Sequence, residues 1–387
     1  MKAISSVVQD LPPSGTVALA DKARAMKAQG LKVTSFAAGE PDFDTPQHIK
    51  EAAYKSLASG FTHYTSSSGI PKLLEAIAAK LQRDSGITVD PGKEIIVTTG
   101  SKIAIYIALA ALLNPGDEVL IFEPAWVSYE AMVRLAGGVP VPVRLDWRTN
   151  FRLEEQQAEA LVTLRTKAML VNSPNNPTGR VLSAEELQVI EKLAVKHDLY
   201  IISDEVYDRI VYNVKPVSPG SLPSLRQRTL TVNGFSKTYA MTGWRLGYVA
   251  GNRDIMNQIL SVQQHLVTCA VSFIQEAGIA ALNGPQEPME AMLREYRQRR
   301  EAIVCLLNQM PGVSCPMPEG AFYALPRFEA YRSSEQLAAT LLEKCLIAVT
   351  PGAAFGHAGE SHLRFSYACS MQDIETGMRL LREFLRP

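Results

Sequence analysis

The segment Lys167–Asp204, "KAMLVNSPNNPTGRVLSAEELQVIEKLAVKHDLYIISD", contains two short apolar runs separated by an amphipathic stretch. The runs "KAMLV" and "LYIISD" have the length of buried strands. Between them, Ser183–His197 has the apolar spacing of a helix and opens with the capping-box pattern Ser183-Ala-Glu-Glu186. Two strands joined by a helix of that length predict a crossover between parallel strands, which is typical of an α/β sheet.

The same alternation extends on both sides of this segment, from about Gly92 to Gly251. Further apolar runs are "EIIVTT", "DEVLIF", "VPVPV", "TLTVN" and "RLGYVAG", and Ser101–Leu113 is a further amphipathic stretch. Strands that alternate with helices predict a largely parallel sheet covered by helices on both faces. The sequence therefore predicts a large α/β domain.

The C-terminal part of the chain has a different pattern and predicts a second, smaller α/β domain. A long charged helix over Met289–Met310 precedes predicted strands near "AFYALP", "LIAVT" and "LRFSYA", and a last helix begins at about Gln372. We expect the N-terminal segment to join this part. The predicted division is a large domain over residues 45–285 and a small domain of residues 1–44 and 286–387.

Composition excludes several classes of partner. Among 387 residues, Lys plus Arg and Asp plus Glu both number 39, so no net charge favours nucleic acid or an anionic membrane. The five cysteines are widely spaced and form no C-x-x-C pair, which argues against a disulfide framework and a metal site. We find no secretion signal and no apolar run of membrane-spanning length, so we expect a soluble cytoplasmic protein.

Polar residues follow five of the predicted strands, where ligands collect in open parallel sheets. These segments are Thr99–Lys102, Glu123–Trp126, Asn172–Gly179, Asp204–Tyr207 and Gly234–Lys237. Each has an ordinary structural interpretation as a turn, a cap, a packed aromatic or a solvated lysine. Together they suit one ligand with a phosphate, an aromatic ring, a ring nitrogen and an aldehyde, namely pyridoxal 5′-phosphate. No G-x-G-x-x-G or Walker A pattern indicates a nucleotide.

Six motifs in order carry a resemblance to a known family. They are "AAGEPDFDTP" (37–46), "HYTSSSGIPKL" (63–73), "NSPNNPTG" (172–179), "SDEVYDRIVY" (203–212), "FSKTYAMTGWRLGY" (235–248) and "LRFSYA" (363–368). With these motifs the chain resembles the class I aminotransferases of the fold-type I pyridoxal-phosphate enzymes, and it is most similar to the bacterial aspartate aminotransferase branch. The resemblance implies a large domain with a mostly parallel seven-stranded sheet and a smaller α/β domain.

The resemblance implies that Lys237 binds the cofactor covalently. Apolar surroundings and a nearby cation would lower the pKa of its amine and make it a better nucleophile. Arg245 would hold the cofactor phosphate, because a planar fork of donors suits that group. Ser101 and Lys102, through backbone N–H groups, and Ser236, through its hydroxyl, would complete the phosphate cup.

Further roles carried by the resemblance concern the cofactor ring and the neighbouring subunit. Asp204 would pair with the ring nitrogen, Tyr207 and Asn176 would bond the ring oxygen, and Trp126 would stack on the ring. Tyr64 resembles a tyrosine that reaches the phosphate from the other subunit. A homodimer with shared active sites follows from that match.

The substrate would be held from several sides. The implied substrate-binding residues are Gly39, Trp126, Asn176, Arg364, Lys102 and Thr16. Arg364 matches the arginine that binds the α-carboxylate in bidentate fashion, and Gly39 would let the backbone approach that group. We find no match for the second arginine that part of the family uses for a side-chain carboxylate. In the branch that this chain resembles, a lysine at the position of Lys102 has that role, with Thr16 as a helper.

The sequence thus predicts an aminotransferase that exchanges an amino group between L-aspartate and 2-oxoglutarate in a ping-pong reaction. Aromatic amino acids or prephenate are alternative substrates. A carbon–sulfur lyase or cyclase on the same fold is a second alternative, since the cofactor apparatus is shared. A third is a non-catalytic regulator half, but such proteins carry a DNA-binding domain ahead of this fold, for which the N-terminal segment leaves no room.

Overall fold

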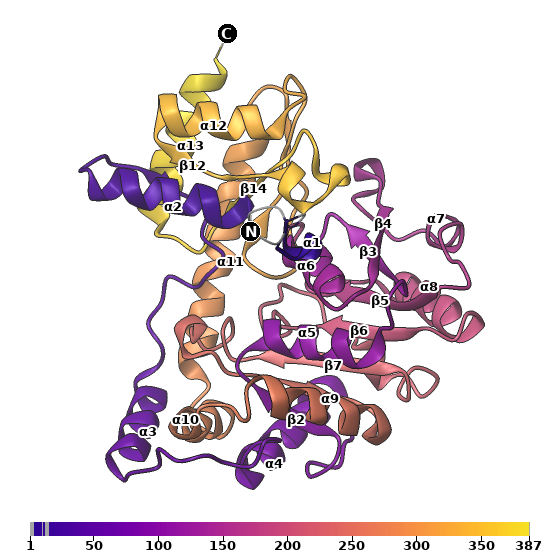
Figure 1. The fold of residues 1–387 in the computed structure, drawn as a ribbon. Helices are drawn as coiled ribbons and strands as arrows, with labels where there is room; N and C mark the ends of the chain where they lie inside the picture. The colour runs from indigo at the N-terminus through magenta and orange to yellow at the C-terminus, as the bar shows by residue number, and fades with distance from the viewer. Residues whose placement is uncertain (1–3, 10, 12–14, 387) are drawn as a thin grey trace.

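The computed structural model describes residues 4–9, 11 and 15–386, apart from the side chains of residues 6 and 15–20. Its centre is a seven-stranded sheet with the order β2-β8-β7-β6-β5-β3-β4 (Figure 1). The strands are β2 (Ile95–Thr98), β3 (Glu118–Glu123), β4 (Val139–Arg144), β5 (Thr166–Asn172), β6 (Tyr200–Asp204), β7 (Thr229–Gly234) and β8 (Gly247–Ala250). All seven predicted runs are confirmed as strands. Only β8 is antiparallel to its neighbours.

Helices cover both faces of this sheet, as the apolar strands predict. Alternate strand residues divide between the two faces: Ile96 packs with the helices of one face, whereas Ile95 and Val97 pack with those of the other. The first face carries α5 (Ser101–Leu112), α6 (Ser128–Leu135) and α9 (Arg253–Leu266). The second carries α4 (Pro71–Lys80), α8 (Ala184–Lys196) and α10 (Ser272–Asn283). The capping box at Ser183 and Glu186 is present as predicted.

The remaining sheets are small and bring together distant parts of the chain. β1 (Thr34–Ser35) pairs in parallel with β12 (Ile347–Ala348). β14 (Leu363–Ser366) lies between β10 (Tyr323–Ala324) and β13 (Thr350–Pro351), and β9 (Val313–Ser314) pairs with β11 (Arg327–Phe328). The strands predicted near "AFYALP", "LIAVT" and "LRFSYA" are thus present, but each spans only two to four residues.

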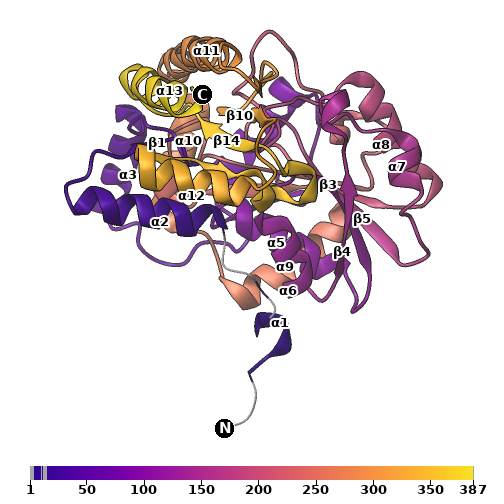
Figure 2. The same cartoon turned by 90° about the horizontal axis from the view of Figure 1, so that it is seen from above.

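Long helices pack around these short strands. α11 (Glu287–Asn308) and α13 (Met371–Leu385) lie side by side at one edge, as the view from above shows (Figure 2). The other helices are α1 (Ser6–Gln9), α2 (Gly15–Ala28), α3 (Gln47–Ala58), α7 (Glu155–Glu159) and α12 (Ser334–Cys345). The division of the chain into two domains stays a prediction. No helix among the described residues is long and apolar enough to cross a membrane.

Candidate active site

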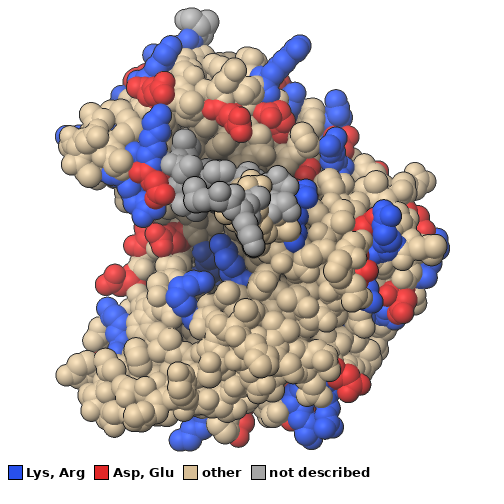
Figure 3. All heavy atoms as spheres, viewed as in Figure 1, with Lys and Arg blue, Asp and Glu red and all other residues tan. Residues whose placement is uncertain are grey.

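A cavity of about 910 Å³ opens at the carboxyl edge of the large sheet, against the part of the chain that carries β14. Figure 3 shows basic side chains inside the hollow between the upper and lower parts of the molecule. The predicted site residues that line the cavity are Gly39, Ser101, Lys102, Trp126, Asn176, Asp204, Tyr207, Ser236, Lys237, Arg245 and Arg364. Gly39 and Arg364, more than three hundred positions apart in the sequence, therefore line the same cavity.

Lys237 follows β7, and its amine lies inside the cavity. Its Nζ donates a hydrogen bond of 2.5 Å to the carbonyl oxygen of Gly39. Burial lowers the pKa of Lys237 to about 8; Glu40 opposes this effect, and Arg364 acts in the same direction as burial. The expected lowering of this pKa is confirmed. A larger fraction of this amine than of an ordinary lysine is therefore neutral, and so nucleophilic, near neutral pH.

Asp204 stands at the end of β6 and is 3% exposed. Its Oδ2 accepts a hydrogen bond of 2.6 Å from the hydroxyl of Tyr129. Burial raises the pKa of Asp204 to about 6, although the Tyr129 hydroxyl and nearby Lys237 oppose that rise. At pH 7 the carboxylate is therefore mostly ionised in a place where water does not compensate it, so a cationic ligand group would be stabilised there.

An anion cradle lies at the start of α5. Gly100 has φ +94°, and a Cβ at that position would come within 2.5 Å of the Arg245 guanidinium. A Cβ at Gly247 would likewise come within 2.5 Å of the Ser101 nitrogen. Only glycines let the guanidinium and the N-terminus of a 12-residue helix approach each other this closely. The helix dipole, the free N–H groups and the guanidinium together suit a phosphate.

Arg364, on β14, is a buried cation that is 3% exposed. It donates to the side-chain oxygen of Asn176 at 3.0 Å, to the Ala37 carbonyl at 2.9 Å and to the Thr350 hydroxyl at 3.2 Å. No carboxylate of a described residue lies within 4.0 Å of its guanidinium. Its Nε is buried without a hydrogen-bond partner. Because a buried charge is costly unless it is paired, this position favours an anionic ligand.

Lys102 and Trp126 lie together on one wall. The Lys102 amine is 4.9 Å from the centre of the Trp126 ring, a cation–π contact. Burial lowers the pKa of Lys102, and Arg245 lowers it further. The Trp126 ring also meets Tyr129 edge to face, with centroids 5.3 Å apart. The tryptophan is therefore held from two sides, and the lysine carries a charge without a carboxylate within 4.0 Å in the described structure.

Two predicted residues remain to be placed. Tyr64 is 85% exposed and does not line the cavity of its own chain. Thr16 belongs to α2, but its side chain lies outside the described part of the structure. The same helix brings two further cations, Arg24 and Lys27, to the cavity wall. Arg24 forms an exposed ion pair with Asp21.

Three residues in the site were missed by the reasoning from sequence. Tyr129 bonds Asp204, and Tyr323 shares a hydrogen bond of 2.9 Å with the hydroxyl of Tyr207. Asn172 donates to the Asp204 carbonyl at 2.9 Å and accepts from the Asn176 nitrogen at 2.8 Å. Asn172 could have been found as the first polar residue after a predicted strand. Tyr129 and Tyr323 carry no such signal, since each belongs to an apolar pattern.

Comparisons with known proteins give a consistent picture. A family model described as aminotransferase class I and II matches residues 32–381. An aspartate aminotransferase of Musicola paradisiaca is 42% identical over 386 residues, covering 99% of this chain and 96% of that protein. An aromatic-amino-acid aminotransferase of Thermococcus litoralis is 43% identical over 364 residues, covering 93% of both. The crystal structure of an aspartate aminotransferase from Thermus thermophilus with maleate is 40% identical, with a TM-score of 0.95 over both full chains.

Proposed function

The chain belongs to the class I and II aminotransferases, and from this premise we propose that it transfers the amino group of L-aspartate to 2-oxoglutarate with pyridoxal 5′-phosphate as cofactor. One observation carries the proposal. A partly buried amine with a lowered pKa, a buried carboxylate, and a buried guanidinium with no carboxylate partner among the described residues share a single cavity. These groups match an aldehyde, a ring nitrogen and a substrate carboxylate.

The residues present fit the proposed cofactor. The glycine cradle between Arg245 and Ser101 suits its phosphate, and Ser236 lies on the same cavity wall. Asp204 would pair with the ring nitrogen and Tyr207 with the ring oxygen, while Trp126 would stack on the ring. When bound, the cofactor supplies an electron sink that makes the Cα proton of an amino acid acidic.

Side chains of the protein would bind the substrate and move its proton. Arg364 would bind the α-carboxylate as a fork, with Asn176 fixing the guanidinium and Gly39 leaving room beside it. Lys237 would hold and move a proton at the substrate Cα, because an amine with a pKa of about 8 suits a general base near neutral pH. Lys102 would bind the side-chain carboxylate of aspartate.

We also propose that the enzyme is a homodimer that shares its active sites. Tyr64 is 85% exposed, and Tyr54 and Leu57, which come shortly before it in the chain, are 73% and 48% exposed. Such residues are enriched where subunits meet. A second chain would cover them and receive Tyr64 at its phosphate cup.

The experiment that tests the reaction class is a panel of amino donors assayed with and without 2-oxoglutarate. An aminotransferase forms a keto acid beyond one equivalent only when the acceptor is present. A lyase would release product continuously without it. Phenylalanine belongs in the panel as a donor, because the relative from Thermococcus litoralis is named for aromatic amino acids. Prephenate, a 2-oxo acid, is tested as an alternative acceptor in place of 2-oxoglutarate.

Arg364→Lys is expected to lower kcat/KM for every substrate by about 10²-fold, because charge remains but the bidentate fork is lost. The measurement compares aspartate, glutamate and phenylalanine as donors. A loss confined to the dicarboxylic substrates would contradict the assignment of Arg364 to the α-carboxylate.

Lys102→Met is expected to lower kcat/KM for aspartate by at least about tenfold and to spare phenylalanine, since only aspartate has a second carboxylate. Methionine keeps the stem over the Trp126 ring and removes the charge. The ratio of the two efficiencies is the measurement. An unchanged ratio would remove Lys102 from substrate recognition and leave aspartate specificity without its proposed cause.

A further inference from the structure

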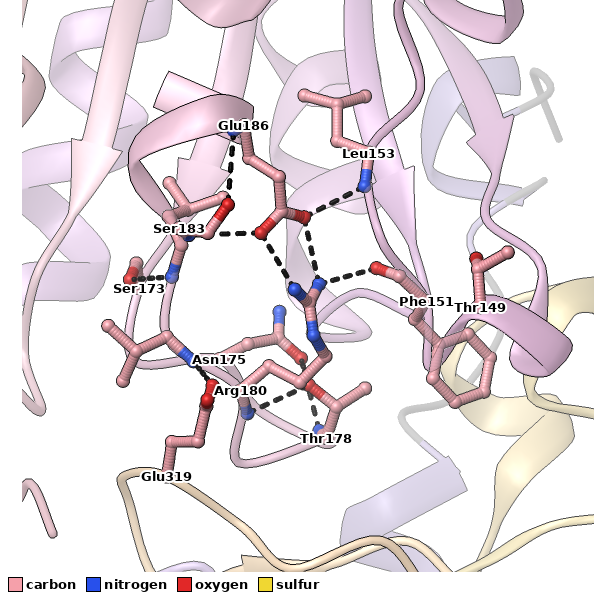
Figure 4. Close-up of polar contacts among 12 residues, drawn as sticks. Thr149, Phe151, Leu153, Ser173, Asn175, Thr178, Arg180, Ser183, Glu186 and Glu319 are labelled. Atoms are coloured by element: carbon pink, nitrogen blue, oxygen red, sulfur yellow. Dashed lines mark hydrogen bonds and ion pairs between the residues drawn. The ribbon is translucent and has the colours of Figure 1, made fainter. Parts of the chain in front are cut away.

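Arg180 and Glu186 form a buried ion pair beside the turn that contains Asn175 and Thr178 (Figure 4). Asn176 belongs to the same turn. Arg180 Nη1 lies 3.0 Å from Glu186 Oε1, and Nη2 lies 2.7 Å from Oε2, so the two groups meet as parallel forks. Their side chains are only 12% and 4% exposed. Neither residue lines the cavity described above, so their burial serves something other than direct contact with substrate.

Glu186 connects Arg180 to two other segments. Its carboxylate accepts the backbone N–H of Ser183 at 3.0 Å, which completes the capping box of α8, and the N–H of Leu153 at 2.8 Å. Burial would raise the pKa of the Glu186 carboxyl, but the hydrogen bonds and charge of Arg180, together with the N–H groups of Ser183 and Leu153, outweigh it and hold that pKa below its usual range. Arg180 Nη1 also donates to the Phe151 carbonyl at 2.6 Å.

The backbone of Arg180 closes the turn from its C-terminal end. The N–H of Asn175 donates to the Arg180 carbonyl at 2.8 Å, and Gly179 closes back on the Asn175 carbonyl at 2.9 Å. Asn175 Oδ1 accepts from Thr178, so the turn is bonded internally around Asn176. The backbone of Asn176 is therefore fixed within a closed turn as long as the Arg180 backbone keeps its position.

The segments tied to this pair also contact the part of the chain that carries Arg364. Glu319 Oε2 accepts from the Val181 nitrogen at 3.0 Å, and the N–H of Glu319 donates to the Gly179 carbonyl at 2.8 Å. The Phe151 ring meets His362, two residues before Arg364, with centroids 5.4 Å apart. The segment that carries Asn176 and the segment that carries Arg364 thus both contact residues bonded to the Arg180–Glu186 pair.

We propose that the Arg180–Glu186 pair is a positioning device for the carboxylate site: it holds Asn176 against Arg364 so that the guanidinium presents its fork to the substrate. This inference rests on the proposed function of Arg364. It assigns Arg180 and Glu186 no contact with substrate or cofactor. It therefore predicts that loss of the pair weakens carboxylate binding, whereas the chemistry at Lys237 changes little.

The test measures binding of two non-reacting carboxylates, maleate and 3-phenylpropionate, to the holoenzyme by calorimetry. Arg180→Met is expected to weaken both by about tenfold, the effect of one misaligned charge-assisted hydrogen bond. KM should rise similarly for all substrates, whereas kcat should change by less than about threefold. Glu186→Gln should match Arg180→Met, and the double variant should be no worse than either, because the pair acts as a unit.

The matched control is Arg228→Met at the other end of α8, where Arg228 bonds the Ala194 carbonyl and the Asp198 carboxylate. That variant removes an ion pair beside the C-terminal end of α8 without touching the turn, so both carboxylates should bind as in the wild type. Equal weakening in Arg228→Met and Arg180→Met, or none in Arg180→Met, would overturn the inference. If Arg180→Met does not fold, Arg180→Lys decides: it should give an intermediate loss, and wild-type affinity there would overturn it.

The two ligands separate this inference from the substrate proposal. A wild type that binds 3-phenylpropionate but not maleate would refute aspartate as substrate and still test the pair through the shared carboxylate. A wild type that binds neither would overturn the carboxylate site at Arg364 and this inference with it.

Discussion

Replacing Lys237 with alanine is expected to lower kcat by about 10⁴-fold or more, because the proposed covalent anchor and the proposed general base are lost together. The fold should persist. The amine makes one hydrogen bond, to Gly39, and burial disfavours its charged form, as the pKa of about 8 indicates. Thermal unfolding of the variant should therefore stay close to that of the wild type.

Borohydride reduction followed by peptide mapping checks the covalent role of Lys237. The wild type should carry the cofactor label on the peptide that contains Lys237, and Lys237→Ala should bind cofactor without any label. Lys102→Met is the control, because it removes another lysine that lines the cavity and should leave the label in place. A label on a different lysine would refute the assignment.

Asp204→Asn is expected to lower kcat by at least about 10²-fold, since it removes the buried charge proposed to pair with the ring nitrogen and leaves the shape of the site unchanged. The amide oxygen can still accept from the Tyr129 hydroxyl, which lies 2.6 Å from the carboxylate. Affinity for the cofactor should fall much less, because the phosphate cradle at Arg245 is untouched. Steady-state kinetics and cofactor titration of the apoenzyme measure the two effects.

Tyr129→Phe is the control for Asp204→Asn, because it removes the hydrogen bond and keeps the charge. It should cost clearly less turnover than Asp204→Asn. Near-normal turnover in Asp204→Asn, without an added compensating group, would exclude Asp204 as the partner of the ring nitrogen.

The large sheet could be predicted from the sequence because most of its strands are buried on both faces and form mainly apolar runs, although the edge strand β4 is largely exposed. The direction of β8 could not be predicted in the same way. β7 ends at Gly234 and β8 begins at Gly247, and the connection holds the Lys237 segment and a single 3₁₀ turn. Without a crossover helix, the chain returns antiparallel. The short strands around β14 depend on partners far away in sequence, which local patterns do not specify.

The candidate site was predictable where a strand end marks a polar residue, as at Asp204 and Asn172. It was not predictable where one side chain supports another across the fold. Tyr129 and Asp204 are 75 positions apart, and Tyr207 and Tyr323 are 116 positions apart. The Arg180–Glu186 pair combines a predictable and an unpredictable contact. The capping box of Glu186 could be predicted from the sequence, but the ion pair of Glu186 with Arg180 could not.

The most direct test of aspartate transamination is a half-reaction, in which L-aspartate is added to the holoenzyme without 2-oxoglutarate. We expect a single change in the cofactor absorbance, one equivalent of oxaloacetate per active site and no free ammonia. Addition of 2-oxoglutarate should then restore the original spectrum and yield one equivalent of glutamate. Continuous release of ammonia and keto acid without an acceptor, or no spectral change with aspartate, would contradict the account.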